Sequence, residues 1–172
     1  MTFFSGFCLQ NEAELFDEYL NLWRENPYVV AGFSYGAIKA LEYTLSHHGR
    51  IDRLILLSPA WFVGMDRSFV RQQMIFYKKS PEKYIQNFYR NVSYPTRIDL
   101  SGYAKESPAE DLKELLGYAW QEEKLREIGR KGVLLEVYLG AKDRIVDANR
   151  AHDFFKNYAT SYLFKPFGHL LR

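Results

Sequence analysis

The sequence predicts an α/β fold in which about five mainly parallel strands are flanked by helices. Short β-prone runs alternate with helical segments along most of the chain. One run, residues 51–58, has the apolar centre Leu-Ile-Leu-Leu, which is typical of a strand buried on both faces of a parallel sheet. The 172 residues are 47% hydrophobic and 17% aromatic, so a single domain can bury a sizeable core.

The chain begins with the first expected strand and helix. Residues 2–5 form a short β-prone run. Residues 11–25 then carry apolar side chains at helical spacing, and Asn11 and Glu14 have the spacing of a capping box at the start of that helix.

The pattern becomes purely helical between residues 64 and 127. Ser80 and Ser107 each precede a proline, which predicts serine N-caps with proline at the first helical position. We expect this segment to be a helical lid inserted after the third strand, on a core made of residues 1–63 and 128–172.

The β pattern resumes after the expected lid. Residues 133–139 and 161–164 predict the fourth and fifth strands, and a helix beginning near Asp147 lies between them. No internal repeat or flexible linker divides the chain, so we expect a single domain.

Charge, hydropathy and cysteine usage exclude several classes of protein. Lys plus Arg number 23 against 21 Asp plus Glu, which lacks the excess of a nucleic-acid-coating protein. No segment approaches the roughly 20 uninterrupted apolar residues of a membrane span, and residues 1–9 lack the basic start of a signal peptide. A single cysteine excludes an internal disulfide, and one Cys with four His lacks the paired spacing of a structural zinc site. We expect a soluble cytoplasmic protein that needs no metal and binds neither nucleic acid nor membrane.

A glycine-flanked serine follows the second expected strand. Residues 28–33 are apolar and run into the motif Gly-Phe-Ser-Tyr-Gly at 32–36, after which apolar residues recur at helical spacing. Small residues on both sides of a serine allow a tight turn from strand to helix that lifts the hydroxyl into a cleft. Ser34 is therefore the candidate nucleophile, and the alternative is that it merely caps the following helix.

A serine nucleophile needs a base and an orienting acid, which in this architecture follow it in the order acid, then histidine. Asp143 lies just beyond the fourth expected strand and His169 just beyond the fifth, where the carboxyl ends of parallel strands gather such groups. His169 is the candidate general base and Asp143 its orienting acid. Asp147 is the rival acid, but it is well placed as an N-cap. The remaining histidines have helix-end or mid-helix positions typical of solvated or capping side chains: His47, His48 and His152.

Two backbone amides are candidates for an oxyanion hole. One belongs to Tyr35, directly after the serine, and the other to Phe7, in the loop after the first strand. Gly6 lets the backbone turn toward Ser34, although an ordinary turn explains this glycine equally well.

With Ser34, Asp143 and His169 in this order, the chain resembles the α/β-hydrolase superfamily over its whole length. It is short for that fold: the usual first two strands and the fourth are not visible, and Ser-Gly at 5–6 stands where the family commonly has His-Gly. Within the superfamily it is similar to the compact BioV-type pimeloyl-acyl-carrier-protein methyl ester esterases. The segments that carry this likeness are 3–7, 32–40 with 42–43, 58–59, 87–89, 140–145 and 169–171.

The resemblance implies a serine carboxylesterase of biotin biosynthesis. Its substrate would be the methyl ester at the far end of a pimeloyl chain carried on acyl carrier protein, and its products methanol and pimeloyl-acyl-carrier protein. The resemblance implies no cofactor. The implied partner is the acyl carrier protein that bears this ester.

The charge pattern of the lid fits an acidic carrier. Between residues 64 and 97, seven basic residues stand against two acidic ones, whereas residues 98–127 have a balance of −4. Acyl carrier proteins are acidic, so we expect the first half of the lid to dock the carrier. We expect lid aromatics to pack on the sheet and to line an acyl channel. The candidate substrate- and carrier-binding residues are Arg67, Arg71, Lys78, Lys79, Phe76, Phe88 and Tyr89.

Other functions stay open at the level of sequence. The same three residues serve acyl thioesterases and general short-chain carboxylesterases. A non-catalytic, hydrolase-like binding protein is less favoured because Ser34, Asp143 and His169 are all present.

Overall fold

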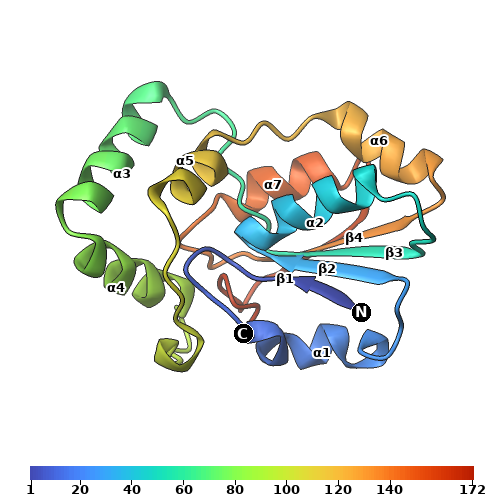
Figure 1. The fold of residues 1–172 in the computed structure, drawn as a ribbon, viewed down its shortest axis with the longest axis horizontal. Helices are drawn as coiled ribbons and strands as arrows, with labels where there is room; N and C mark the ends of the chain where they lie inside the picture. Colours follow the sequence, from blue (N-terminus) through green and yellow to red (C-terminus); the bar gives the residue numbers. More distant parts are fainter.

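The computed structural model describes residues 1–172 as one five-stranded sheet with helices on both faces (Figure 1). Neighbouring strands follow the chain order, and every neighbouring pair is parallel. All five predicted strands are confirmed, in a sheet that is wholly parallel. They are β1 (Thr2–Phe4), β2 (Val29–Phe33), β3 (Arg53–Leu57), β4 (Leu134–Gly140) and β5 (Thr160–Phe164).

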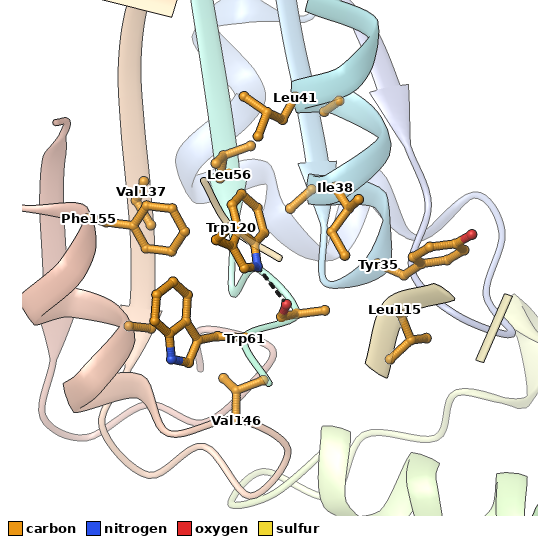
Figure 2. Packing of buried hydrophobic residues seen from close by; sticks show 14 of the residues in the cluster. Tyr35, Ile38, Leu41, Leu56, Trp61, Leu115, Trp120, Val137, Val146 and Phe155 are labelled. Atoms are coloured by element: carbon orange, nitrogen blue, oxygen red, sulfur yellow. Dashed lines mark hydrogen bonds between the residues drawn. The ribbon is translucent and has the colours of Figure 1, made fainter. Parts of the chain in front are cut away.

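Three helices cover one face of the sheet: α2 (Tyr35–Ser46), α6 (Glu122–Arg130) and α7 (Ala148–Phe155). Alternate side chains of the strands point into this layer. Figure 2 shows Ile38 and Leu41 of α2 near Leu56 of β3, with Trp120 and Phe155 beside them. The indole of Trp120 donates to the carbonyl of Ala60 across 2.9 Å, so its polar atom is satisfied within the core.

The opposite face is covered by a segment that is not one continuous helix. It comprises η1 (Glu12–Phe16), α1 (Asp17–Leu20) and η2 (Asn21–Trp23), of which η1 and η2 are 3-10 turns. The predicted capping box is wrong: Asn11 has a φ of 60° and its side chain caps nothing. Asn11 has a left-handed backbone conformation, and the next residue, Glu12, points inward and accepts the Gly6 amide at 2.6 Å.

The connection from β1 to β2 has an unusual hand. Each connection steps to the next strand in the same direction across the sheet, but α2 and α7 pack on one face and η1 with α1 on the other. Two crossovers that step the same way on opposite faces have opposite hands. The β1–β2 connection therefore has the opposite hand to the β2–β3 and β4–β5 connections, in a class of connections that are right-handed in about 98% of cases.

The helical insertion predicted after the third strand is present and lies beyond the carboxyl ends of the strands (Figure 1). It contains α3 (Arg67–Lys79), α4 (Pro81–Val92), η3 (Ser101–Tyr103) and α5 (Ala109–Gly117). The expected boundary at residue 127 falls inside α6, which packs on α2 and β4.

Of the two serine N-caps predicted in this insertion, one is confirmed in position and the other is wrong. Ser80 is the N-cap residue of α4 and a proline follows it, as predicted, although the Ser80 side chain makes no cap hydrogen bond. The helix α5 begins one residue later than predicted, with Pro108 at the N-cap position. Ser107 is not a cap because its hydroxyl accepts the backbone amide of Cys8, 3.2 Å away.

Candidate active site

Ser34 lies in a strained turn between β2 and α2. Its φ of 54° and ψ of −114° are a rare combination for a residue with a side chain. The turn is held because the Ser34 amide donates to the carbonyl of Leu57 and the Ser34 carbonyl accepts from the amides of Ala37 and Ala60. The serine side chain makes no cap hydrogen bond, so the capping alternative is wrong.

Glycines make this turn possible. A Cβ on Gly32 would lie 2.2 Å from the carbonyl oxygen of Gly36, and a Cβ on Gly36 would lie 1.9 Å from that of Phe4. The backbone of the turn and of α2 therefore packs directly against that of the strands, with no room for a side chain between them, as the motif requires. Ser34 is 3% exposed and opens into a cavity under the helical insertion.

His169 and Asp143 complete a hydrogen-bonded chain to the serine. The Nε2 atom of His169 is 2.9 Å from Ser34 Oγ, and its Nδ1 atom is 2.5 Å from Asp143 Oδ2. Both the histidine and the aspartate side chains are fully buried. Because a carboxylate only accepts hydrogen bonds, Nδ1 donates to Asp143, and Nε2 is left to accept the serine hydroxyl.

The Asp143 carboxylate is itself fixed by the backbone. Its Oδ1 accepts the amides of Ile145 at 2.6 Å and Val146 at 3.1 Å, which leaves Oδ2 for the histidine. The His169 ring packs against Phe33, with ring centroids 5.1 Å apart. These contacts hold the imidazole in one orientation.

The rival residues have other partners. Asp147 accepts the amide of Arg150 at 3.0 Å and caps α7, as predicted. His152 shares a hydrogen bond with Ser161, 2.9 Å away, and His47 and His48 follow the end of α2.

The two predicted oxyanion donors come from different segments of the chain, the start of α2 and the loop after β1. Tyr35 is the first residue of α2, where helical geometry leaves amides without a partner in the helix. The Phe7 amide donates to no group of the chain, although Phe7 is only 2% exposed and lines the same cavity as Ser34. Both neighbouring amides are paired: Gly6 donates to Glu12, and Cys8 donates to Ser107.

The phenol of Tyr35 ties the turn to the insertion. Its hydroxyl donates to Glu114 at 2.8 Å and lies 3.4 Å from Asp111, both on α5. Burial raises the pKa of this phenol, and the hydrogen bond to Glu114 raises it further. Tyr35 therefore stays protonated and acts as a donor.

Sequence reasoning missed Glu12 and Ser107. Glu12 is fully buried, and Ser107 lies about 100 residues from the loop that it holds. Both residues lie in segments that the sequence pattern predicts as helix starts. Only the three-dimensional contacts with residues 6–8 reveal what they touch.

The cavity at Ser34 has a volume of about 350 Å³ and is mostly apolar. Of the predicted substrate residues, Phe88 lines it, whereas Phe76 is half-exposed on α3 and Tyr89 donates from its hydroxyl to the carbonyl of Cys8. Ten of its fifteen lining residues are hydrophobic. The fifteen are Phe7, Ser34, Phe62, Met65, Phe69, Gln73, Tyr84, Asn87, Phe88, Asn91, Leu112, Leu115, Leu116, Arg144 and Ile145.

The four predicted basic residues are exposed on α3 and form no ion pair within the chain. Arg67 and Arg71 lie one helical turn apart, and Lys78 and Lys79 lie in the last turn. Their positive charge is not neutralised by neighbouring side chains.

None of the helices has the length and apolar character that crossing a membrane requires. The side chains also form no group of three or more His, Cys, Asp or Glu residues that could hold a metal ion.

Comparison with known proteins identifies the fold. No family model and no curated protein matches the sequence. Solved structures do: an esterase from Exiguobacterium antarcticum is 21% identical with a TM-score of 0.52, and the match covers 90% of this chain and 64% of that one. MenH from S. aureus is 15% identical with a TM-score of 0.54, over 98% of this chain and 85% of that one. BioG from Haemophilus influenzae is 12% identical with a TM-score of 0.59, over 98% and 87%.

These neighbours are α/β-hydrolases, and the chain has a compact form of that fold. It spans less than two thirds of the Exiguobacterium esterase but most of the length of MenH and BioG.

Proposed function

We propose that this protein is a serine carboxylesterase in which Ser34 is the nucleophile, His169 the general base and acid, and Asp143 the orienting acid. The observation that carries the proposal is the buried hydrogen-bonded chain from Asp143 through His169 to Ser34 at the wall of an apolar cavity. Esterases among the structural neighbours support the same class of chemistry.

The mechanism follows from the geometry. His169 Nε2 takes the hydroxyl proton as Ser34 Oγ attacks the ester carbonyl, and the amides of Phe7 and Tyr35 hold the oxyanion. The intermediate collapses, His169 passes the proton to the departing alkoxide, and the alcohol leaves. Water then attacks the acyl-enzyme with the same base, which releases the carboxylic acid and restores Ser34. Asp143 holds the imidazole in the required tautomer and stabilises its cation.

For the substrate, we propose the methyl ester of a pimeloyl chain carried on acyl carrier protein, hydrolysed in the cytoplasm during biotin biosynthesis. The sequence resemblance to BioV-type esterases supports this choice. A cavity with mostly apolar walls is suited to an acyl chain. The unpaired basic residues of α3, close to that cavity, are suited to an acidic carrier.

A gel-shift assay of pimeloyl-carrier-protein methyl ester tests both the proposed chemistry and the proposed substrate. We expect conversion by the unaltered chain and none by Ser34→Ala, with a short methyl ester assayed in parallel. Conversion of the short ester alone would keep Ser34 as nucleophile and remove biotin synthesis from the proposal. If a fluorophosphonate probe fails to label the unaltered chain, the function as a serine hydrolase is wrong.

A series of methyl esters of increasing acyl length tests the role of the cavity. We expect kcat/KM to rise with each methylene while the chain still fills the cavity, because each buried methylene contributes about 0.8 kcal/mol. Replacing Phe88, whose ring lines the cavity, with alanine should flatten this rise. A rate that is indifferent to acyl length would contradict an acyl channel.

A further inference from the structure

The loop after β1 presents one free amide between two paired ones. Gly6 N–H donates to Glu12 Oε1 at 2.6 Å, and Cys8 N–H donates to Ser107 Oγ at 3.2 Å. The amide of Phe7, between them, has no partner in the chain. Two anchors therefore hold the backbone on either side of the one N–H group that is free to face a substrate.

The geometry of the loop links the hydrogen bond of Glu12 to the orientation of the Phe7 amide. The carbonyl of Gly6 accepts the amide of Leu9 at 3.2 Å, so the planar peptide unit that contains the Phe7 N–H is fixed at its oxygen end by this turn. The preceding peptide unit, which ends in the Gly6 N–H, is fixed by Glu12. Rotation of either peptide unit would change the direction of the Phe7 N–H group in the cavity that Phe7 and Ser34 both line.

The burial of Glu12 is costly for a purely structural residue. Its side chain is fully buried, and its second oxygen, Oε2, has no hydrogen-bond partner. An unpartnered polar atom costs free energy that an apolar side chain of the same size would not. Burial raises the pKa of Glu12, while the hydrogen bond from the Gly6 amide acts in the opposite sense. An acceptor for Gly6 is present in either protonation state.

We infer that Glu12 is a positioning residue of the oxyanion hole: its carboxyl group holds the Gly6 amide so that the next amide, that of Phe7, points at the carbonyl oxygen of the bound ester. This inference rests on the proposed function of Ser34 as an esterase nucleophile. Glu12 touches neither the substrate nor the reacting atoms. It acts through one backbone amide, and its own chemistry is only that of a hydrogen-bond acceptor.

Substitutions at residue 12 distinguish the effect of the hydrogen-bond acceptor from the effects of the charge and the length of the side chain. Glu12→Met keeps the length and removes the acceptor, Glu12→Gln keeps an acceptor without the charge, and Glu12→Asp keeps the charge but withdraws it by one methylene. Kinetics on a short methyl ester should be expressed per active site, counted by end-point titration with a fluorophosphonate. Thr44→Val is the matched control, because it removes a buried hydrogen bond within α2, outside the active site.

We expect Glu12→Met to lower kcat per active site by roughly 10- to 100-fold, with KM changed by less than about threefold, because a misaimed donor weakens the transition state and not the substrate complex. A boronic acid, which forms a tetrahedral adduct with the serine, should bind more weakly by a similar factor. Glu12→Gln should restore kcat to within about threefold of the unaltered chain, since its amide oxygen still accepts from Gly6. If Glu12→Met does not fold, Glu12→Asp should show the same loss.

Two outcomes would overturn the inference. Glu12 is only structural if the loss appears as fewer titratable sites with unchanged kcat per site, as we expect for Thr44→Val. The acceptor argument is wrong if Glu12→Gln loses as much kcat as Glu12→Met. Failure of the unaltered chain to bind the fluorophosphonate or to hydrolyse the ester would instead be a failure of the proposed function, and it would be seen before any variant is made.

Discussion

Asp143 and Asp147 lie four residues apart and differ in what they touch. Asp143 accepts from His169, whereas Asp147 accepts from the first turn of α7. We expect Asp143→Asn to lower kcat by about 10⁴-fold on a short ester, because an amide favours the wrong histidine tautomer. The folded chain should be otherwise intact, with an unchanged circular dichroism spectrum.

Asp147→Ala provides the matched control for that variant. It should keep kcat within about twofold and lower the free energy of unfolding by about 1 kcal/mol, through loss of the cap. Urea unfolding and ester kinetics of the two variants give the comparison. A large loss of kcat in Asp147→Ala, with little in Asp143→Asn, would mean that the two roles are exchanged.

Glu12 makes the stability of the fold depend on pH in a predictable direction. Burial raises its pKa above the ordinary value of 4.5, so between the two values the folded chain binds more protons than the unfolded chain. The contribution of Glu12 to the free energy of unfolding is therefore fully present below about pH 4.5 and is lost as the pH rises through the raised pKa. Glu12→Gln does not titrate, so its stability relative to the unaltered chain should increase as the pH rises from 4 to 8.

Urea unfolding of both chains at several pH values measures this difference directly. Glu14→Gln, the same substitution at an exposed residue of the same 3-10 turn, is the control. Parallel stability curves for Glu12→Gln and the unaltered chain would contradict the prediction.

The residues that the sequence predicts for this site are those whose type and spacing follow directly from the chemistry. Ser34, Asp143 and His169 each follow a recognisable strand, and the structure brings them together. Ser107 is predicted from the sequence as an N-cap, and Glu12 receives no role because it lies within the capping-box stretch that Asn11 and Glu14 define. Their actual partners are backbone amides of a distant loop, and no local pattern encodes such a contact.

At the scale of elements, the close approach of α2 to β1 depends on glycine. A Cβ on Gly36 would overlap the backbone of Phe4 and Ser5, which cannot move without breaking the pairing of β1 with β2. We expect Gly36→Ala to lower the free energy of unfolding by more than about 3 kcal/mol, or to prevent folding. Thermal unfolding and yield of folded protein measure this effect.

A glycine-to-alanine substitution in α6 should raise the free energy of unfolding instead. Gly129 lies in α6, and a Cβ there meets no atom within 4 Å. Gly129→Ala should stabilise the fold by about 0.5–1 kcal/mol, because alanine loses less backbone entropy in a helix. A Gly36→Ala variant as stable as the unaltered chain would contradict the close approach of α2 to β1, and a destabilised Gly129→Ala variant would contradict the open space at Gly129 of α6.

Elements whose pattern is local were predicted well, and those shaped by distant contacts were not. The strand β3 could be predicted from its own residues, because a short, continuous apolar run is typical of a strand buried on both faces of a parallel sheet. The segment of residues 11–25 also has helical spacing, but it is divided into η1, α1 and η2, and Glu12 near its start contacts the distant Gly6 amide. The handedness of the β1–β2 connection could not be predicted either, since the general rule gives the opposite hand.

At the scale of the whole molecule, charge is separated across the insertion. Seven basic residues lie between residues 64 and 97, whereas α5 and α6 carry six of the eight acidic residues between 98 and 127. On α6 the basic side chains are paired, as Arg126 is with Glu122. On α3 they are not, so unpaired positive charge lies on a helix of the insertion, beyond the carboxyl ends of the strands (Figure 1).

This separation predicts a salt dependence that is specific to the carrier-bound substrate. Exposed charges are screened beyond about 10 Å at 0.1 M salt, so kcat/KM for the carrier ester should fall steeply between about 0.02 and 0.3 M salt. A short, uncharged methyl ester meets the same Ser34 without docking on α3, and its kcat/KM should change little. Equal salt dependence for both substrates would contradict carrier docking on this helix.

Charge reversal on α3 tests the same surface directly. Arg67→Glu combined with Arg71→Glu should lower kcat/KM for the carrier ester by at least about 10-fold at low salt, mainly through slower association, and should flatten its salt dependence. Arg126→Glu combined with Arg130→Glu makes the same change at the same spacing on α6. These arginines lie in exposed ion pairs, each worth little to stability, so the control should fold and keep its activity on both esters within about twofold. A similar loss on the carrier ester from both pairs would mean that net charge, and not α3, governs the encounter.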